Sequence, residues 1–220
     1  MNPDSHRPLD GVLREDAGRA DRAGFIGPSI GALEHALYFT SAPSLVQKTH
    51  EVLDQGRLLL PGAVVVWDET IGRRKGSQAV PNAWWAQAGS LTAAFAFRAG
   101  ASRFDAAGWI ARAASAVQRE VEAFGPRAAL EFRAPNDLLL DGRKLGALAA
   151  ERHGGADIVY VRLNANPDLA KAPRAIAANA CRLADHVDLH QLPIQSSTAL
   201  ANALLQRLMV TLPEALAPQA

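Results

Sequence analysis

Two stretches of the chain contain residues whose types and spacing could do chemistry, and the first is the loop "GRRKGS", Gly72 to Ser77. Its two glycines allow the backbone to approach a ligand closely, and successive N–H groups in such a loop can form an anion-binding nest. The cations between the glycines can hold a phosphate. The pattern indicates a phosphate or adenylate site, with a solvated basic loop as the alternative. The spacing is not that of a P-loop.

The second stretch is "RAPNDLLLDGRKLGALAAE", Arg133 to Glu151. It contains an Asn136-Asp137 corner, with Lys144 seven residues after Asp137 at the entry of an apolar run. Asn and Asp favour turns through local hydrogen bonds, and a lysine at a strand edge discourages edge pairing. The functional interpretation is that Asp137 faces a nucleotide or an incoming amine, while Lys144 neutralises anions that react together.

The remaining candidates are weaker. Trp84 and Trp85 lie in the long loop, where they could cover a ligand or pack the loop onto the body. Cys181 is the single cysteine and resembles a small core residue. The stretch "DHVDLH" carries two histidines and two aspartates, but no further region with ligand spacing supports a metal site, so none is predicted.

The elements that must position these residues follow from periodicity and turn signals. We predict helices over 41–56, 102–125, about 172–185 and about 196–211. Strands are predicted over 62–69 and 91–99, and then over three segments: 127–132, 137–140 leading into 144–151, and 157–165. Asp141-Gly142 predicts a tight hairpin turn, because a type I′ turn needs positive φ at both central residues. The order is helix, strand, long loop, strand, helix, three strands and two helices. Adjacent strands separated from helices indicate an α+β fold with helices packed on the sheet.

Composition limits the classes of function. The chain has 220 residues, is 49% hydrophobic and carries a net charge of +1, which suits one domain and gives no general attraction to nucleic acid or membrane. No apolar run approaches the length of about 20 residues that a membrane span needs. One cysteine forms no internal disulfide, which indicates a reducing cytoplasm. Residues 1–28 are predicted to be a flexible arm, and 29–220 a single domain.

In this order the stretches resemble the catalytic core of the biotin and lipoate protein ligase family, most closely its biotin protein ligase branch. The resemblance is carried by "DETIGRRKGS", "GSLTAAFAFR", "RAPNDLLLDGRKLGALAAE" and "VYVRLNAN" and covers roughly residues 30 to 215. It implies a class II synthetase-like core with a mixed, mostly antiparallel sheet. It also implies that ATP, with Mg²⁺, and a small acid such as biotin or lipoate form an acyl-adenylate. The acyl group then passes to a lysine of an acceptor protein domain.

The resemblance also implies roles for particular residues. Lys144 matches the lysine that contacts the acid's carboxylate and the α-phosphate, and Asp137 and Asn136 match the corner near the adenylate and the acceptor lysine. Asn164 matches the end of the family's Gly-Ile-Asn strand. The loop that folds over the intermediate, and an aromatic within it, are matched by Gly72, Arg73, Arg74, Lys75, Gly76, and Trp84 or Trp85.

Some positions depart from the family pattern. Glu69 stands where biotin ligases usually place the glutamine that reads the ureido ring, and Arg133-Ala134 replaces the usual Lys-Trp. Two alternatives therefore stay open: an octanoyl or lipoyl transferase that needs no ATP, and a non-catalytic ligand-binding member of the same fold. The resemblance implies no nucleic-acid or membrane partner. Family members often pair through their sheets, so a homodimer is one expected arrangement.

Overall fold

The computed structural model describes residues 25–26, 33, 35–69, 86–189 and 198–217. Within these residues the chain forms one eight-stranded sheet in the order β1-β2-β3-β4-β8-β7-β6-β5. The strands are β1 Phe25–Ile26, β2 His35–Phe39, β3 Gly62–Val66, β4 Leu91–Arg98, β5 Leu130–Arg133, β6 Asp137–Leu140, β7 Arg143–His153 and β8 Ala156–Leu163. Of the pairings between described strands only β2 with β3 is parallel, and two isolated bridges, Ala42 with Glu69 and Lys144 with Ala180, are parallel as well. The predicted mixed, mostly antiparallel sheet is confirmed.

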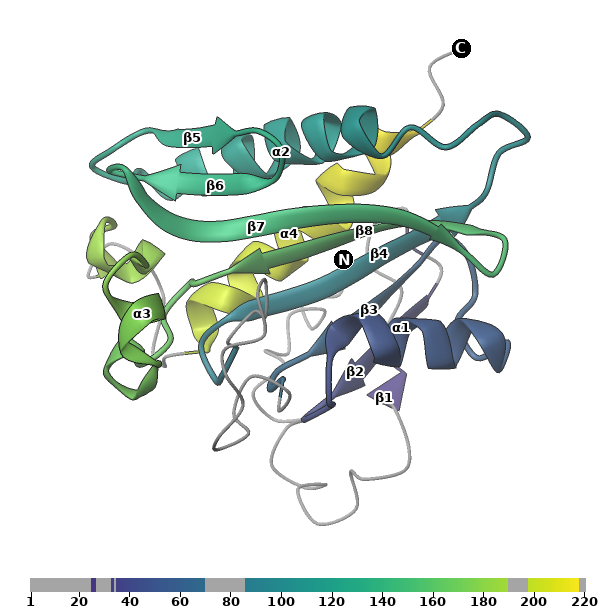
Figure 1. The fold of residues 1–220 in the computed structure, drawn as a ribbon, viewed down its shortest axis with the longest axis horizontal. Helices are drawn as coiled ribbons and strands as arrows, with labels where there is room; N and C mark the ends of the chain where they lie inside the picture. Colours follow the sequence, from purple (N-terminus) through teal and green to yellow (C-terminus); the bar gives the residue numbers. More distant parts are fainter. Residues whose placement is uncertain (1–24, 27–32, 34, 70–85, 190–197, 218–220) are drawn as a thin grey trace, which may run out of the picture.

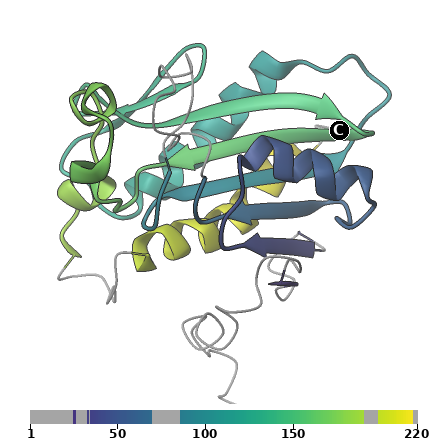
Figure 2. The ribbon, with the colours of Figure 1, turned by 60° about the horizontal axis from the view of Figure 1, so that its bottom comes forward.

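Helices cover both faces of this sheet. Helix α1 (Leu45–Asp54) lies on one face over β3 and β4, and α2 (Ala106–Glu122) and α4 (Ala199–Leu216) lie together on the other (Figures 1 and 2). Each strand contributes side chains to the cores on both faces of the sheet, because neighbouring residues of a strand point to opposite faces. Phe95 and Val161 pack with α2 and α4, whereas Ala94 and Tyr160 pack on the α1 side.

The helix boundaries follow local capping chemistry. Ser44 caps α1, because its hydroxyl accepts a hydrogen bond from the Gln47 N–H at 3.1 Å. Gly56 ends that segment at a φ of 63°, a conformation that glycine adopts without strain. Asp105 caps α2 in the same way by accepting from the Gly108 N–H.

The hairpin of β6 and β7 turns as the sequence predicts. Asp141 and Gly142 both have positive φ, at 53° and 70°. The register shifts beside Leu138 and Leu139, where Lys144 pairs with Leu139 and Gly146 with Leu138. Leu145, between those two positions, is fully buried in the core against α2 and α4. This β-bulge allows Leu145 and Leu148, which are three residues apart, to face the same core.

The predicted helix over about 172–185 is wrong. The segment is instead broken into a 3₁₀ turn η3 (Leu169–Lys171), a short helix α3 (Arg174–Ala177) and a second 3₁₀ turn η4 (Leu183–Asp185). The Lys144 N–H donates to the Asn179 carbonyl at 2.8 Å, and the Cys181 N–H donates to the Lys144 carbonyl at 3.0 Å. These backbone hydrogen bonds to β7 take the place of the i to i−4 hydrogen bonds that a continuous helix would form.

Two further expectations need correction. Within the described residues a helix is not the first element, because β1 and β2 precede α1, and Phe25 and Ile26, within the predicted arm, pair antiparallel with β2. The rest of that arm, residues 1–24 and 27–28, lies outside the described residues. Helix α4 covers 199–216 rather than 196–211 and continues past Pro213. Leu212, Pro213 and Leu216 are all buried, so packing of this last turn offsets the N–H that proline lacks.

Candidate functional site

A row of four residues crosses the face of the sheet that carries α1. The strand register pairs Asp137 of β6 with Ala147 of β7, Ala147 with Arg162 of β8, and Arg162 with Thr92 of β4. Their sequence neighbours Leu138, Leu148 and Val161 pack in the opposite core, so the row points away from α2 and α4. With strands about 4.8 Å apart, Asp137 and Arg162 are roughly 10 Å apart at the backbone.

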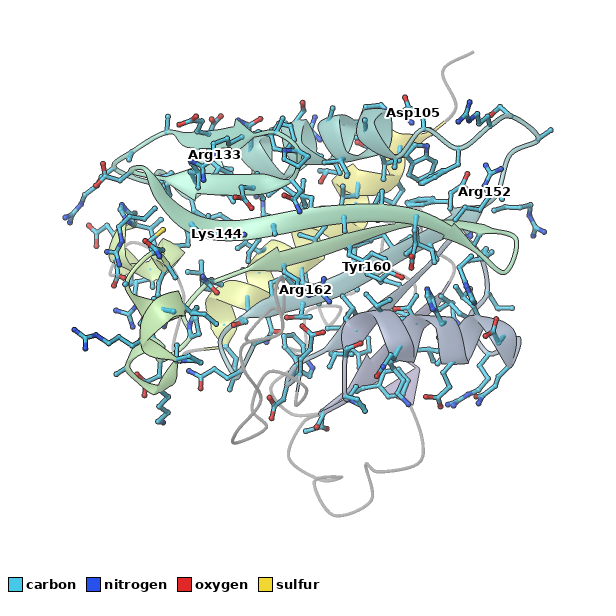
Figure 3. All side chains as sticks on the ribbon, in the orientation of Figure 1. Asp105, Arg133, Lys144, Arg152, Tyr160 and Arg162 are labelled. Atoms are coloured by element: carbon cyan, nitrogen blue, oxygen red, sulfur yellow. The ribbon has the colours of Figure 1, made fainter. Side chains whose placement is uncertain are left out.

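Lys144 and Asp137 form the ion pair at one end of the row. Lys144 Nζ lies 2.7 Å from Asp137 Oδ1, and Arg133 Nη2 lies 3.5 Å from Asp137 Oδ2. The Lys144 side chain keeps 39% of its surface exposed, so it remains accessible to a ligand. Figure 3 shows Lys144 on β7, below Arg133. Two cations around one carboxylate leave a positive excess, which favours an anionic ligand.

Glu69 and Arg162 form a second, deeper ion pair toward the other end of the row. Glu69 Oε2 accepts from Arg162 Nε and Oε1 from Arg162 Nη2, both at 3.1 Å. The same Oε1 also accepts from the Leu45 N–H at 2.6 Å, which ties the first turn of α1 to the end of β3. The Glu69 side chain is 2% exposed. This two-point contact fixes the plane of the Arg162 guanidinium, whose residue is labelled on β8 in Figure 3.

The two asparagines predicted for the site have different surroundings. Asn136 is half-buried at the turn before β6, and its carbonyl accepts from the Leu148 N–H. Asn164 is buried just after β8, two residues beyond Arg162. Its N–H donates to the Leu145 carbonyl and its own carbonyl accepts from Leu183, so it joins β7 to η4. Asn164 therefore also has a structural role at this end of the sheet.

The predicted loop residues Gly72, Arg73, Arg74, Lys75 and Gly76, and the aromatic pair Trp84 and Trp85, lie outside the described residues. Their roles stay predictions. Glu69, which pairs with Arg162, is the last described residue before that loop.

Cys181 is buried and faces the core shared with α2 and α4, opposite the row. Its thiol lies 3.6 Å from the Leu140 carbonyl and 3.5 Å from the Arg143 carbonyl. Burial raises the pKa of this thiol to about 11, so it stays protonated at neutral pH and is a poor nucleophile. This geometry gives no support to a transferase that uses Cys181 covalently.

A separate cluster of polar side chains, formed by His50, Glu151, His153 and Tyr160, connects α1 to β7 and β8 away from the Glu69–Arg162 pair. Glu151 Oε1 lies 2.6 Å from His50 Nε2 and also accepts from the Tyr160 hydroxyl at 2.6 Å. His50 stacks on His153, with ring centroids 3.8 Å apart. Burial, and then the hydrogen bond to Glu151, raise the pKa of Tyr160. Because Tyr160 stays a neutral donor, this group serves to hold α1 in place.

Arg162, Thr92 and Leu45 are the site residues that sequence reasoning missed. Arg162 is the one charged residue inside the apolar run "IVYVRL", which was a usable signal. Nothing in the local sequence signals Thr92, because its place depends on the register of β4 against β8.

This fold is found in many solved structures, among them three from different organisms. The biotin protein ligase from Aquifex aeolicus in complex with biotin and ATP is 17% identical, with a TM-score of 0.59 over 81% of this chain and 70% of that one. The Leishmania major biotin protein ligase in complex with biotinyl-5-AMP is 18% identical, with a TM-score of 0.56 over 86% and 76%. A T. acidophilum protein described as a lipoate protein ligase candidate, with bound lipoic acid, is 12% identical, with a TM-score of 0.54 over 81% and 84%.

No family model matches the sequence, and no curated protein matches it either. The structural likeness nevertheless defines the class of fold: the chain has the fold of the biotin and lipoate protein ligase catalytic core. Within the described residues, no helix is long and apolar enough to cross a membrane. No group of three or more His, Cys, Asp or Glu side chains in that part of the chain could hold a metal ion.

Proposed function

We propose that the protein is an ATP-dependent ligase that joins a small carboxylic acid, such as biotin, lipoate or a related acid, to a lysine of an acceptor protein. The observation that carries this proposal is the Lys144–Asp137 pair, with Nζ and Oδ1 2.7 Å apart, on the α1 side of this ligase-type sheet. The resemblance to the family implies that this pair belongs to the reacting end of the ligand.

In the first step, an oxygen of the acid's carboxylate attacks the α-phosphorus of ATP. A C–O–P bond forms, the bond between the α- and β-phosphates breaks, and pyrophosphate leaves with its electron pair. Carboxylate and phosphate are both anions, so their approach requires fixed cations. The exposed Nζ of Lys144 and the guanidinium of Arg133 supply positive charge there.

In the second step, the amine of the acceptor lysine attacks the acyl carbon, an amide bond forms and AMP leaves. The amine must lose a proton, and the carboxylate of Asp137 is placed to orient the amine or accept that proton. Because Asp137 is paired with Lys144, a proton taken up by Asp137 would also weaken its ion pair with Lys144.

The described side chains form no metal cage, so Mg²⁺ would be carried by the phosphates of ATP, which it binds readily in water. Its charge would lower the repulsion between carboxylate and phosphate when the nucleotide is bound. A mixed anhydride hydrolyses in water, so a cover over the site is required. We propose that the loop with Gly72, Arg73, Arg74, Lys75, Gly76, Trp84 and Trp85 supplies this cover.

Pyrophosphate release that depends on one acid from a panel of biotin, lipoate and octanoate tests the proposal. Lys144→Ala should lower the rate at least about 100-fold, the usual scale for a lost charge aimed at the reacting atoms. The matched control is Lys171→Ala, which removes an exposed lysine paired with Asp168 and should leave the rate unchanged. Pyrophosphate release at the wild-type rate in Lys144→Ala would overturn the role of Lys144. Acid-independent release would overturn the ligase assignment.

A further inference from the structure

The end of the sheet opposite Lys144 carries exposed arginines. Arg98 is the last residue of β4, and Arg103 lies in the segment between β4 and α2. Within the described part of the chain, neither side chain makes a hydrogen bond or an ion pair. Arg152 of β7 lies at this end, eight residues beyond Lys144, which is roughly 25 Å of extended strand. Figure 3 shows Lys144 and Arg152 at opposite ends of β7.

Two arginines at this end are held against aromatic rings. Arg112 Cζ lies 5.5 Å from the centroid of the Trp109 ring, and Arg152 Cζ lies 5.6 Å from that of Phe104. The rings of Phe104 and Trp109 pack on each other, with centroids 5.7 Å apart. Contact with a ring limits the motion of a guanidinium. A partner that binds at this end therefore orders less side-chain freedom than it would at arginines that move freely.

The carboxylates at this end already have partners of their own. Asp157 is buried and accepts from Arg152 Nε at 2.6 Å and from Nη2 at 3.0 Å. Asp105 accepts the N–H that begins α2, and Asp54 Oδ1 lies 2.8 Å from His153 Nε2. None of these contacts involves Arg98, so the exposed arginines leave an excess of positive charge at this end of the sheet.

An exposed leucine lies at the same end. Leu59 is 57% exposed and stands three residues before Gly62, the first residue of β3. Gly62 pairs with Ala96, two residues before Arg98, which places Leu59 and Arg98 at one end of the sheet. The Leu59 N–H donates to His35 Nδ1 at 3.2 Å, so its backbone is held in place. Apolar surface beside arginines and aromatic rings is typical of the core of a protein interface.

We propose that this end of the sheet docks an extended, acidic segment of a partner protein. The docking surface consists of Leu59, Arg98, Arg103, Phe104, Trp109 and Arg112. Strands β3, β4, β8 and β7 are consecutive in the sheet, so their ends span roughly 15 Å, which an extended segment of about five residues crosses. Carboxylates of that segment meet the arginines, and an apolar side chain covers Leu59.

The chemistry of this surface favours a protein over a nucleic acid. Single-stranded nucleic acids bind through open ring faces on which bases stack. Here the Trp109 and Phe104 rings carry the guanidiniums of Arg112 and Arg152 and pack on each other. Leu59 has nothing to offer a phosphate, whereas it can pack against an apolar side chain of a peptide. The docking surface is separate from the candidate site, so the inference does not rest on the proposed function.

Fluorescence anisotropy with a labelled synthetic peptide tests the docking surface on the full chain. The probe alternates glutamate and leucine over about eight residues, which is long enough to cross the surface. Arg98→Gln combined with Arg103→Gln should weaken its binding at least about 10-fold, because the charges that face its carboxylates are gone. No binding to the wild-type protein at about 1 mM would overturn the proposal.

The matched control combines Arg127→Gln with Arg174→Gln. These two arginines are also exposed, and their side chains also have no partner among the described residues. The control has the same net charge as the Arg98 and Arg103 double variant and should bind the peptide as the wild type does. Equal weakening in the two double variants would show a general charge attraction and would overturn the docking surface.

Leu59→Ser separates the apolar contact from the charges. It should weaken the glutamate–leucine peptide about 5-fold and leave binding of a glutamate–serine peptide of the same length unchanged. Val210→Ser, which changes an exposed apolar residue on α4, should affect neither peptide. An equal loss with both peptides in Leu59→Ser, or no loss with either, would contradict the contact at Leu59.

Two further measurements distinguish this surface from other roles. A thymidine oligonucleotide that binds more tightly than the peptide, and is lost in the Arg98 and Arg103 double variant, would overturn the choice of a protein partner. Pyrophosphate release in that variant should equal the wild-type rate, since the surface lies roughly 25 Å from Lys144. A lower rate would assign these arginines to the reaction instead. Peptide binding without any acid-dependent pyrophosphate release would keep the docking surface and remove the ligase function.

Discussion

Replacing Glu69 by glutamine should destabilise the fold more than any comparable change to a surface carboxylate. Glu69 accepts three hydrogen bonds, two from Arg162 and one from the Leu45 N–H, with a side chain 2% exposed. Glutamine keeps the size but loses the charge and one acceptor oxygen. Arg162, whose side chain is 14% exposed, would then be left without its counter-ion, and breaking a largely buried pair in this way costs about 3–5 kcal/mol.

Urea unfolding, monitored by circular dichroism, measures this loss of stability. The urea concentration at the midpoint should fall, while the slope of the unfolding free energy against urea concentration stays the same. The control is Glu51→Gln. Its partner Lys48 is 2.6 Å away, but that pair is solvent-exposed, so its loss should stay within about 0.5 kcal/mol. The double variant with methionine at both Glu69 and Arg162 should recover most of the loss, because an apolar pair carries no uncompensated charge. A loss below about 1 kcal/mol in Glu69→Gln would refute the claim that this pair anchors the site.

Three other changes test the framework around the site. Folding raises the pKa of the Cys181 thiol from an ordinary value near 9.0 to about 11. Between these two pH values the folded protein keeps the thiol proton, whereas the unfolded chain has lost it. Stability present below about pH 9 should therefore fall by roughly 2–3 kcal/mol up to about pH 11, and unfolding curves of Cys181→Ala should lack that fall. Gly146→Ala would bring a Cβ to 2.3 Å from a backbone carbonyl oxygen of β8 and should cost at least about 2 kcal/mol by urea unfolding. In Gly100→Ala the new Cβ comes no nearer than 3.8 Å, and that variant should stay within about 0.5 kcal/mol of wild type. Asp105→Ala removes the side-chain cap of α2 and should lower the melting point by an amount equivalent to about 1 kcal/mol; an unchanged melting point would show that the cap contributes nothing.

Local signals in the sequence predicted much of the fold. The Ala-rich periodicity of α2 and the Asp141-Gly142 turn act within a few residues, and both are present. Strand β2 is five residues long with four of them buried, too short for a clear alternating pattern. The break after α3 depends on bonds to β7 from residues more than thirty positions away, which no local propensity reveals.

The candidate site likewise combines one contact that the local sequence predicts with others that depend on long-range strand pairing. Asp137 and Lys144 lie on one hairpin, so their spacing in sequence predicted their contact, now seen at 2.7 Å. The Glu69–Arg162 pair joins positions 93 residues apart, and Thr92 enters through the pairing of β4 with β8. These contacts exist only because the sheet order places β8 between β4 and β7.

The bonds on both sides of Lys144 determine which substitutions its surroundings tolerate. Its N–H and carbonyl are held by the backbone of Asn179 and Cys181, and backbone groups are common to nearly all amino acids. The side chain of Asn179 can therefore vary widely while the lysine keeps its place. Position 181 excludes proline, which has no N–H to donate. Related chains can thus diverge in this segment without moving the lysine, and sequence similarity there is a poor guide to a shared site.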